Sequence, residues 1–192
     1  MACPPLRRDS LASPGADREA IVKTQRRPIP IATQIDVYFR DRWLCHLCHR
    51  PVILHLALKH ATQVVHRVLP KAPLAYWAGT WSRDGAPLLD ELAASIDHVE
   101  PLAQGGADDI SNYAAVCARC NARKSARRDA EYIEAARPWK VKGKHGEPTR
   151  WDGLSSLYVA LVKEGGHRLS PTERRWYELL AARLARGSGR AV

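Results

Sequence analysis

Apolar residues recur with helical spacing at both ends of the ordered part of the chain. The series Ile31–Phe39 has apolar positions three and four residues apart, and it predicts a helix that leads through Trp43 into Cys45. Residues 51–70 mix Leu and β-branched residues with histidines. Neither the helical nor the strand period dominates there, and the stretch stays unassigned. A later series, 154–162, predicts another helix.

The last predicted helix carries the clearest start signal. Ser170 is a good N-cap, Pro171 suits the first helical position, and Glu173 lies three residues after the cap, which together form a capping box. An apolar stripe follows on one face, and such a stripe is more often buried core than interface. Its members are Trp176, Leu179, Leu180 and Leu184.

The central segment changes from strand-like to helical patterning. Residues 94–102 read as a strand that closes at the turn residues 104–106. Residues 112–116 return as a short extended segment, and 118–137, which contains no Pro or Gly, predicts a helix that ends before Pro138. The expected order is strand, turn, strand, helix.

Composition separates three regions. Residues 1–30 hold five prolines and few large apolar side chains, so we expect a disordered basic arm. Residues 31–137 form the expected domain, with an insertion at about 51–94 that contains a Trp-bearing loop, 76–81. Residues 138–192 form a basic linker and a helical extension.

Charge then points to the partner. The 192 residues carry a formal net charge of +10, with a pI near 9.7 and 45% hydrophobic residues, which is typical of a globular protein that binds a polyanion. No apolar run approaches the roughly 18 residues of a membrane span, and the N-terminus lacks the apolar segment of a signal peptide. We therefore expect a nucleic-acid partner, no membrane, and a cytoplasmic location, either at the nucleoid or in a host cell if the gene is a phage gene.

Four of the five cysteines form two C-x-x-C pairs, Cys45 with Cys48 and Cys117 with Cys120. In a reducing compartment, four thiolates around a tetrahedral zinc ion are a better interpretation than disulfides. Cys3 stands apart. His46 and His49 flank the first pair as alternative ligands, but four cysteines make them unnecessary.

The segment around the second pair resembles the HNH endonucleases and their ββα-metal motif. The resemblance rests on Asp97-His98, the turn Gly105-Gly106, Asn112, and the run Cys117-Ala-Arg-Cys120-Asn121-Ala-Arg-Lys124. It covers about residues 95–128, and about 31–137 when the first cysteine pair is included. Chance would rarely place these residues in this order around a C-x-x-C pair. Taken alone, Asp-His before a turn would be interpreted as an ordinary surface loop.

The resemblance implies a mechanism. His98 would be the general base that activates water, Asp97 and Asn121 would hold Mg²⁺ or Mn²⁺, and Asn112 would fix the loop and help orient the histidine. Asn121 stands where other members have histidine. Because neighbouring strand residues point to opposite faces, Asp97 and His98 would reach one phosphate only at a bent or bulged strand end.

The basic residues concentrate near this motif. Ten basic and four acidic residues lie between 119 and 150, so we expect DNA phosphates to meet this stretch. A solvated helix face is the plain alternative for each. The predicted DNA contacts are Arg119, Arg123, Lys124, Arg127 and Arg128.

These observations together predict an α+β fold: a ββα-metal HNH core stapled by a four-cysteine structural zinc site, with flanking helices and a disordered arm. The predicted function is metal-dependent hydrolysis of DNA phosphodiester bonds to a 5′ phosphate and a 3′ hydroxyl. The alternative is a zinc-stabilised nucleic-acid-binding module without catalysis. Restriction, homing, phage DNA-packaging and nicking nucleases all fit this fold, and the oligomeric state stays open.

Overall fold

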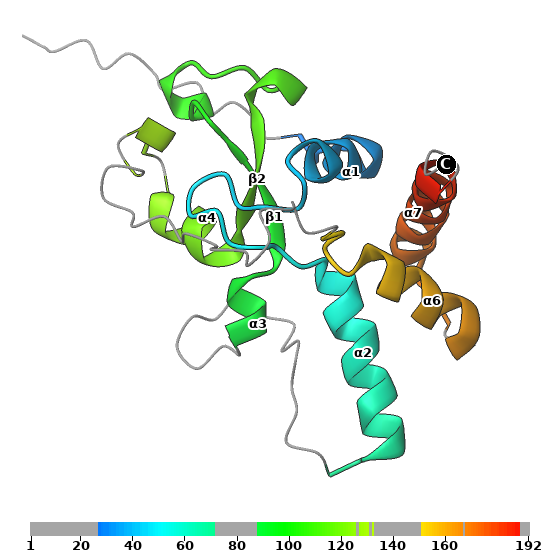
Figure 1. Cartoon of the computed structure of the whole chain (residues 1–192). Helices are drawn as coiled ribbons and strands as arrows, with labels where there is room; N and C mark the ends of the chain where they lie inside the picture. The colour runs from blue at the N-terminus through cyan, green and yellow to red at the C-terminus, as the bar shows by residue number, and fades with distance from the viewer. Residues whose placement is uncertain are drawn as a thin grey trace, which may run out of the picture.

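The structure is a computed structural model that describes residues 27–71, 88–125, 127–130, 132, 151–166 and 168–188. Most of the predicted N-terminal arm, the Trp-bearing loop and the basic linker lie outside the described residues. Within them, helices surround one two-stranded sheet (Figure 1).

The sheet pairs β1, Ala94–His98, with β2, Tyr113–Cys117, in antiparallel register. Ala94 lies opposite Cys117, and His98 lies opposite Tyr113 at the other end. Two short 3-10 helices, Leu102–Gln104 and Ile110–Asn112, lie in the connection. Every residue of β2 is buried, so the small sheet lies inside the molecule rather than at its surface.

Helix α4, Ala118–Lys124, follows β2 without a linker and packs against both strands. The sequence predicted one helix over residues 118–137, and this prediction is wrong at Ser125, which has a φ of 54° and ends α4. The turn brings Asp129 back to the amino group of Lys124, at 2.9 Å. A buried ion pair therefore outweighs the local helical preference of this stretch.

Helix α1, Ile31–Arg40, confirms the first predicted helix and supplies much of the core. The chain then turns at Trp43, whose buried ring stacks on Tyr38 with centroids 4.8 Å apart. Gly153 lies against this indole: a Cβ there would overlap the ring, and its φ of +65° also favours glycine.

Three further helices cover the other side of the core. They are α2, His55–Val68, α6, Ser155–Gly165, and α7, Pro171–Ser188, and they lie on the opposite side of the sheet from α4 (Figure 1). α2 resolves the stretch that the sequence left unassigned. The capping box is confirmed, because the Glu173 amide donates to Ser170 Oγ and the Ser170 amide donates to Glu173 Oε2.

The predicted stripe on α7 faces the core, with Trp176 and Leu180 buried. A four-residue helix, α3, Leu88–Glu91, precedes β1. This mixture of helices with a small sheet confirms the α+β class. Among the described residues, no helix is long and apolar enough to cross a membrane.

Candidate active site and metal centre

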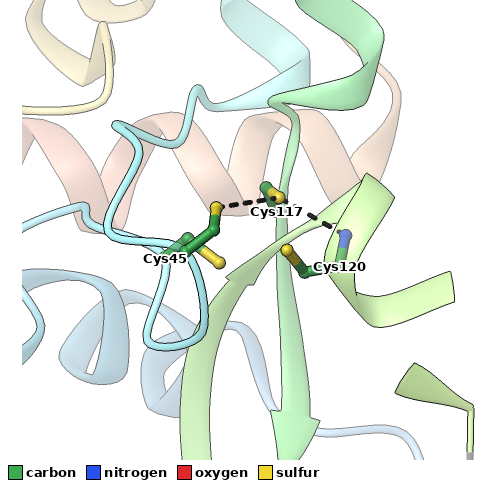
Figure 2. Close-up of side chains that lie close together, drawn as sticks. Cys45, Cys117 and Cys120 are labelled. Carbon is green, nitrogen blue, oxygen red and sulfur yellow. Dashed lines mark hydrogen bonds between the residues drawn. The ribbon is translucent and has the colours of Figure 1, made fainter. Parts of the chain in front are cut away.

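Two cysteine pairs that are far apart in the sequence meet at one point. Cys45 and Cys48 lie in the turn after α1, Cys117 ends β2, and Cys120 lies in the first turn of α4. Their four sulfur atoms lie within 4.8 Å of one another. Figure 2 shows Cys45, Cys117 and Cys120 gathered from these segments, with the Cys120 amide donating to Cys117 Sγ.

This arrangement fits zinc. Four thiolates at about 2.3 Å from a tetrahedral zinc ion would be about 3.8 Å from one another. The Cys48 and Cys117 sulfurs are 3.9 Å apart, and hydrogen bonding from Cys117 holds the pKa of the Cys48 thiol well below its ordinary value. The four cysteines could therefore hold a zinc ion with little rearrangement.

Backbone hydrogen bonds hold the first pair against the sheet. The His46 amide donates to the Ala115 carbonyl of β2, and the Cys45 amide donates to the Arg50 carbonyl across the turn, each at 2.8 Å. His49 completes the turn with a φ of 58°. The turn around the first pair is thus built onto β2, so the cysteine cluster and the sheet share one framework.

His98 ends β1 and is nearly fully buried, at 3% relative exposure. Its Nε2 atom lies 3.0 Å from Asp108 Oδ1. The Tyr113 ring meets the imidazole edge-on from the paired strand, with centroids 5.1 Å apart. The Tyr113 hydroxyl also donates to Asp108 Oδ1, at 2.7 Å, so one carboxylate oxygen joins both side chains.

Asp97, one residue earlier, has different partners. Its Oδ2 atom lies 2.8 Å from Lys124 Nζ, and the same ammonium group contacts Asp129 Oδ1 and donates to the His98 carbonyl. Regular pairing continues through both positions of β1, so the bulge expected at this strand end does not occur within the ladder. Asp97 and His98 therefore enter separate polar clusters.

The cluster around Lys124 is charged and closed to solvent. Burial lowers the pKa of Lys124, but hydrogen bonds with Asp97 and Asp129 outweigh it, and the pKa lies above its ordinary value. Burial alone would raise the pKa of Asp129. Hydrogen bonds from His46 and Lys124 outweigh burial, so the pKa of Asp129 lies below its ordinary value. Since His46 Nε2 lies 3.2 Å from Asp129, the cluster reaches the first cysteine pair.

Asn121 approaches the same face of β1 as Asp97. Its amide nitrogen donates to Ser95 Oγ at 2.7 Å, and Ser95 and Asp97 share a face because they are two residues apart on one strand. An amide that donates through nitrogen keeps its oxygen as an acceptor. A carboxylate and an amide oxygen on adjoining elements are ligands that suit a hard divalent cation.

Asn112 fixes the connection between the strands. Its side chain accepts from the Glu100 amide and donates to the carbonyls of Glu100 and Ala107, all within 2.9 Å. Gly106 lies directly beneath the Glu100 carbonyl, where a Cβ would overlap it. These contacts agree with the expected role of Asn112 in fixing the loop. The side-chain contact to His98 comes from Asp108 instead.

The predicted DNA contacts divide into two kinds. Arg119, Arg123 and Arg127 line a pocket of about 520 Å³ beside the cysteine cluster, together with Arg50, whereas Arg128 pairs with Glu100. Arg119 is itself paired with Glu91 in the pocket wall.

Lys124 requires a correction among the predicted DNA contacts. Its side chain has no exposed surface, and its charge is directed at two carboxylates rather than at a phosphate. We therefore remove it from that set.

Three residues at the site escaped the sequence reasoning: Asp108, Asp129 and Arg50. The pattern around Asp108 offered a signal, because a second acidic residue, Asp109, follows it directly and only one of the two is needed to cap the following 3-10 helix. Asp129 and Arg50 gave no such signal. Their roles depend on contacts across the fold.

Comparison with known proteins identifies one part of the chain. Residues 85–127 match the model of the HNH endonuclease family. This match confirms the family resemblance for the segment that contains β1, β2 and α4, and it indicates a nuclease-type function. No curated protein and no solved structure matches the chain.

Proposed function

We propose that this protein is a metal-dependent endonuclease that hydrolyses DNA phosphodiester bonds. The observation that carries the proposal is the match of residues 85–127 to the HNH family, within which His98 ends β1 and Asn121 packs against the same strand. Asp97 and His98 point to opposite faces of the regular ladder, so the proposal requires the end of β1 to bend when DNA and the cation bind. The net charge of +10 supports a polyanionic substrate.

In this proposal His98 is the general base. An imidazole can take a proton from water near neutral pH, which generates the nucleophile that attacks the phosphorus. The P–O3′ bond then breaks and leaves a 5′ phosphate and a 3′ hydroxyl. The buried ring is held by Asp108 and Tyr113, so it meets the substrate already oriented.

Asp97 and Asn121 would hold the divalent cation, which fits Mg²⁺ or Mn²⁺. Two protein oxygen ligands are enough for Mg²⁺, since water and substrate phosphate commonly supply the others. A bound cation would supply charge stabilisation for the phosphoryl oxygens and for the leaving oxygen. It would share the Asp97 carboxylate with the ammonium group of Lys124.

The four-cysteine centre has a structural role in this proposal. A zinc ion there would join the turn after α1 to β2 and α4, which carry the proposed catalytic residues. The arginines around the adjoining pocket, Arg50, Arg119, Arg123 and Arg127, would contact backbone phosphates and bind DNA without reading its sequence.

Plasmid cleavage by single variants tests the proposal. His98→Ala should bind zinc and DNA as the parent does but cut roughly 10²- to 10⁴-fold more slowly, because only proton transfer is lost. Asp97→Ala should also cut slowly, yet raised Mn²⁺ should restore part of its activity, since its defect is weaker cation binding. His49→Asn is the control and should cut normally, because His49 is exposed and asparagine tolerates its positive φ.

Two outcomes would overturn the proposal. If the parent binds DNA but fails to cut plasmid or single-stranded DNA with any divalent cation, the protein is a binding module without catalysis. If His98→Ala cuts at the rate of the parent, the general base lies elsewhere. Zinc content and the thermal unfolding midpoint of each variant establish that it is folded.

A further inference from the structure

We propose that Asp108 is the positioning residue for His98: it fixes the imidazole with its proton on Nε2, so that Nδ1 is the atom that accepts the proton from water. This inference rests on the proposed function, in which His98 is the general base. It adds a residue that the sequence motif does not assign and names the reacting nitrogen.

The contact itself gives the tautomer. Asp108 Oδ1 lies 3.0 Å from His98 Nε2. An ionised carboxylate is only an acceptor, so the nitrogen beside it must carry the hydrogen. In a neutral imidazole with a proton on Nε2, the lone pair that can accept a proton belongs to Nδ1.

The surroundings hold this pair in one geometry. The Tyr113 hydroxyl donates to the same Oδ1 atom at 2.7 Å, and the Tyr113 ring packs against the imidazole edge. His98 is buried, while the Asp108 side chain keeps 31% of its surface exposed and is partly solvated as a charged group. Each of the three side chains therefore restricts the other two.

The backbone places Asp108 independently of this contact. Asn112 ties the carbonyl of Ala107, the preceding residue, to the loop, and Asp109, the following residue, caps the 3-10 helix through the Ser111 amide. Asp108 is thus fixed from both sides. A carboxylate at this position can direct the imidazole without first ordering the loop.

The proton balance is simple. One water O–H bond breaks, its proton moves to Nδ1, and its oxygen forms the new bond to phosphorus while the P–O3′ bond breaks. The departing 3′ oxygen takes a proton from solvent water and becomes the hydroxyl, and the imidazolium returns its extra proton to solvent after the step. The resulting imidazolium keeps its Nε2 hydrogen directed at Asp108, so its positive charge develops beside a negative carboxylate. Such a pairing stabilises the protonated base during the reaction.

The test substitutes Asp108 in the full-length, zinc-loaded protein. The side-chain amide introduced by Asp108→Asn can donate to Nε2, which favours the tautomer with the proton on Nδ1 and blocks the base. We expect the cleavage kcat to fall roughly 10²- to 10⁴-fold, as is typical when a histidine base loses its tautomer. The KM should change no more than about threefold, since Asp108 acts in this proposal through His98 and not on the substrate.

A spectroscopic measurement distinguishes positioning from a structural role. Nitrogen-15 NMR of the His98 ring at about pH 8.5, where an ordinary imidazole is neutral, should show the protonated nitrogen at Nε2 in the parent and at Nδ1 in Asp108→Asn. Comparison with His98→Ala assigns the signals. Asp108→Glu should recover part of the activity because it restores a carboxylate. The matched control is Asp109→Asn, which removes the same charge one residue away but keeps a side-chain oxygen that can still accept from the Ser111 amide, so it should leave the tautomer and kcat unchanged.

Each result decides a separate point. An Nδ1 proton in the parent, or an unchanged kcat in Asp108→Asn, would overturn the role of Asp108. An equal loss of kcat in Asp109→Asn would show that the loss comes from removing a nearby negative charge and not from the contact between Asp108 and His98. If the parent does not cut DNA at all, the proposed function fails, while the tautomer measurement still tests the Asp108–His98 contact.

Discussion

At the scale of single residues, local spacing predicted the cluster of four cysteines but not the polar clusters. Each C-x-x-C pair is recognisable from four consecutive residues, so the cluster of four sulfur atoms could be predicted without knowledge of the fold. Lys124 is the opposite case. It ends a basic helix and looks like a solvated charge, but its partners Asp97 and Asp129 reach it only through the pairing of β1 and the turn at Ser125.

Replacing this lysine should be costly. Lys124→Met should lower the free energy of unfolding by about 3–5 kcal/mol, because it leaves two buried carboxylates without their cation. Urea denaturation with zinc present measures the loss. Arg123→Ala, one residue earlier and exposed, is the control and should change stability by no more than about 0.5 kcal/mol. A Lys124→Met protein as stable as the control would mean that the ion pairs contribute nothing net.

At the scale of elements, helices with a local start signal or a regular apolar spacing were predicted well. The capping box placed the start of α7 correctly, and the apolar spacing located α1 and α6. Tertiary contacts decided the remaining elements. α2 carries histidines and a lysine whose placement depends on α6 and α7, and α4 ends early because its last residue is drawn into an ion pair.

The capping glutamate of α7 also holds α2. Burial raises the pKa of Glu173, but Lys59 and the Ser170 hydrogen bonds outweigh it and lower the pKa from 4.5 to about 2. A folded-state pKa below the unfolded value stabilises the protein above about pH 4.5, and this contribution is lost as the pH falls toward 2. The difference corresponds to about 3 kcal/mol, since the Glu173 side chain is only 10% exposed.

Glu173→Gln should therefore be less stable than the parent at neutral pH, and the gap should close between about pH 5 and pH 2. Denaturation curves of both proteins across this range measure the gap, and comparison of the two cancels any loss of zinc at low pH. Glu178→Gln, an exposed glutamate on the same helix, is the control. If the difference in unfolding free energy between the two proteins stays constant with pH, the negative charge of Glu173 contributes nothing to stability.

At the scale of the whole molecule, the cysteine cluster joins segments that are about seventy residues apart in the chain. The sequence predicted that a substantial structure lies between the two pairs, and α2 and β1 lie there. How these elements pack was beyond sequence reasoning, because the order of helices around a two-stranded sheet depends on long-range contacts.

Zinc binding at this junction should account for a large part of folding stability. We expect about one zinc ion per chain, and Cys117→Ser should lose it and unfold at a lower temperature. Serine is a suitable substitution because Cys117 is also the N-cap of α4, and a hydroxyl preserves that cap. Elemental analysis and thermal unfolding measure both effects. Cys3→Ser should behave as the parent, and full zinc retention by Cys117→Ser would remove that residue from the ligand set.

Arg119 and Arg123 of the arginine-lined pocket lie on α4, the helix that also carries Asn121. Each phosphate contact releases condensed counterions, which makes the affinity fall with salt. Replacing Arg119, Arg123 and Arg127 by Ala should therefore flatten the plot of log affinity against log salt by roughly two to three, at about 0.9 per lost contact. Fluorescence anisotropy with labelled duplex DNA and Ca²⁺ in place of Mg²⁺ measures binding without cleavage.

The control removes two positive charges from the far side of the core. Arg174 and Arg175 are exposed on α7, across the core from α4, and replacing both by Ala should leave the slope unchanged because no proposed phosphate lies there. If instead the α7 variant flattens the slope and the variant lacking Arg119, Arg123 and Arg127 does not, DNA binds over the helical extension. The pocket arginines would then serve chiefly to balance the negative charge of Glu91 and of the cysteine cluster.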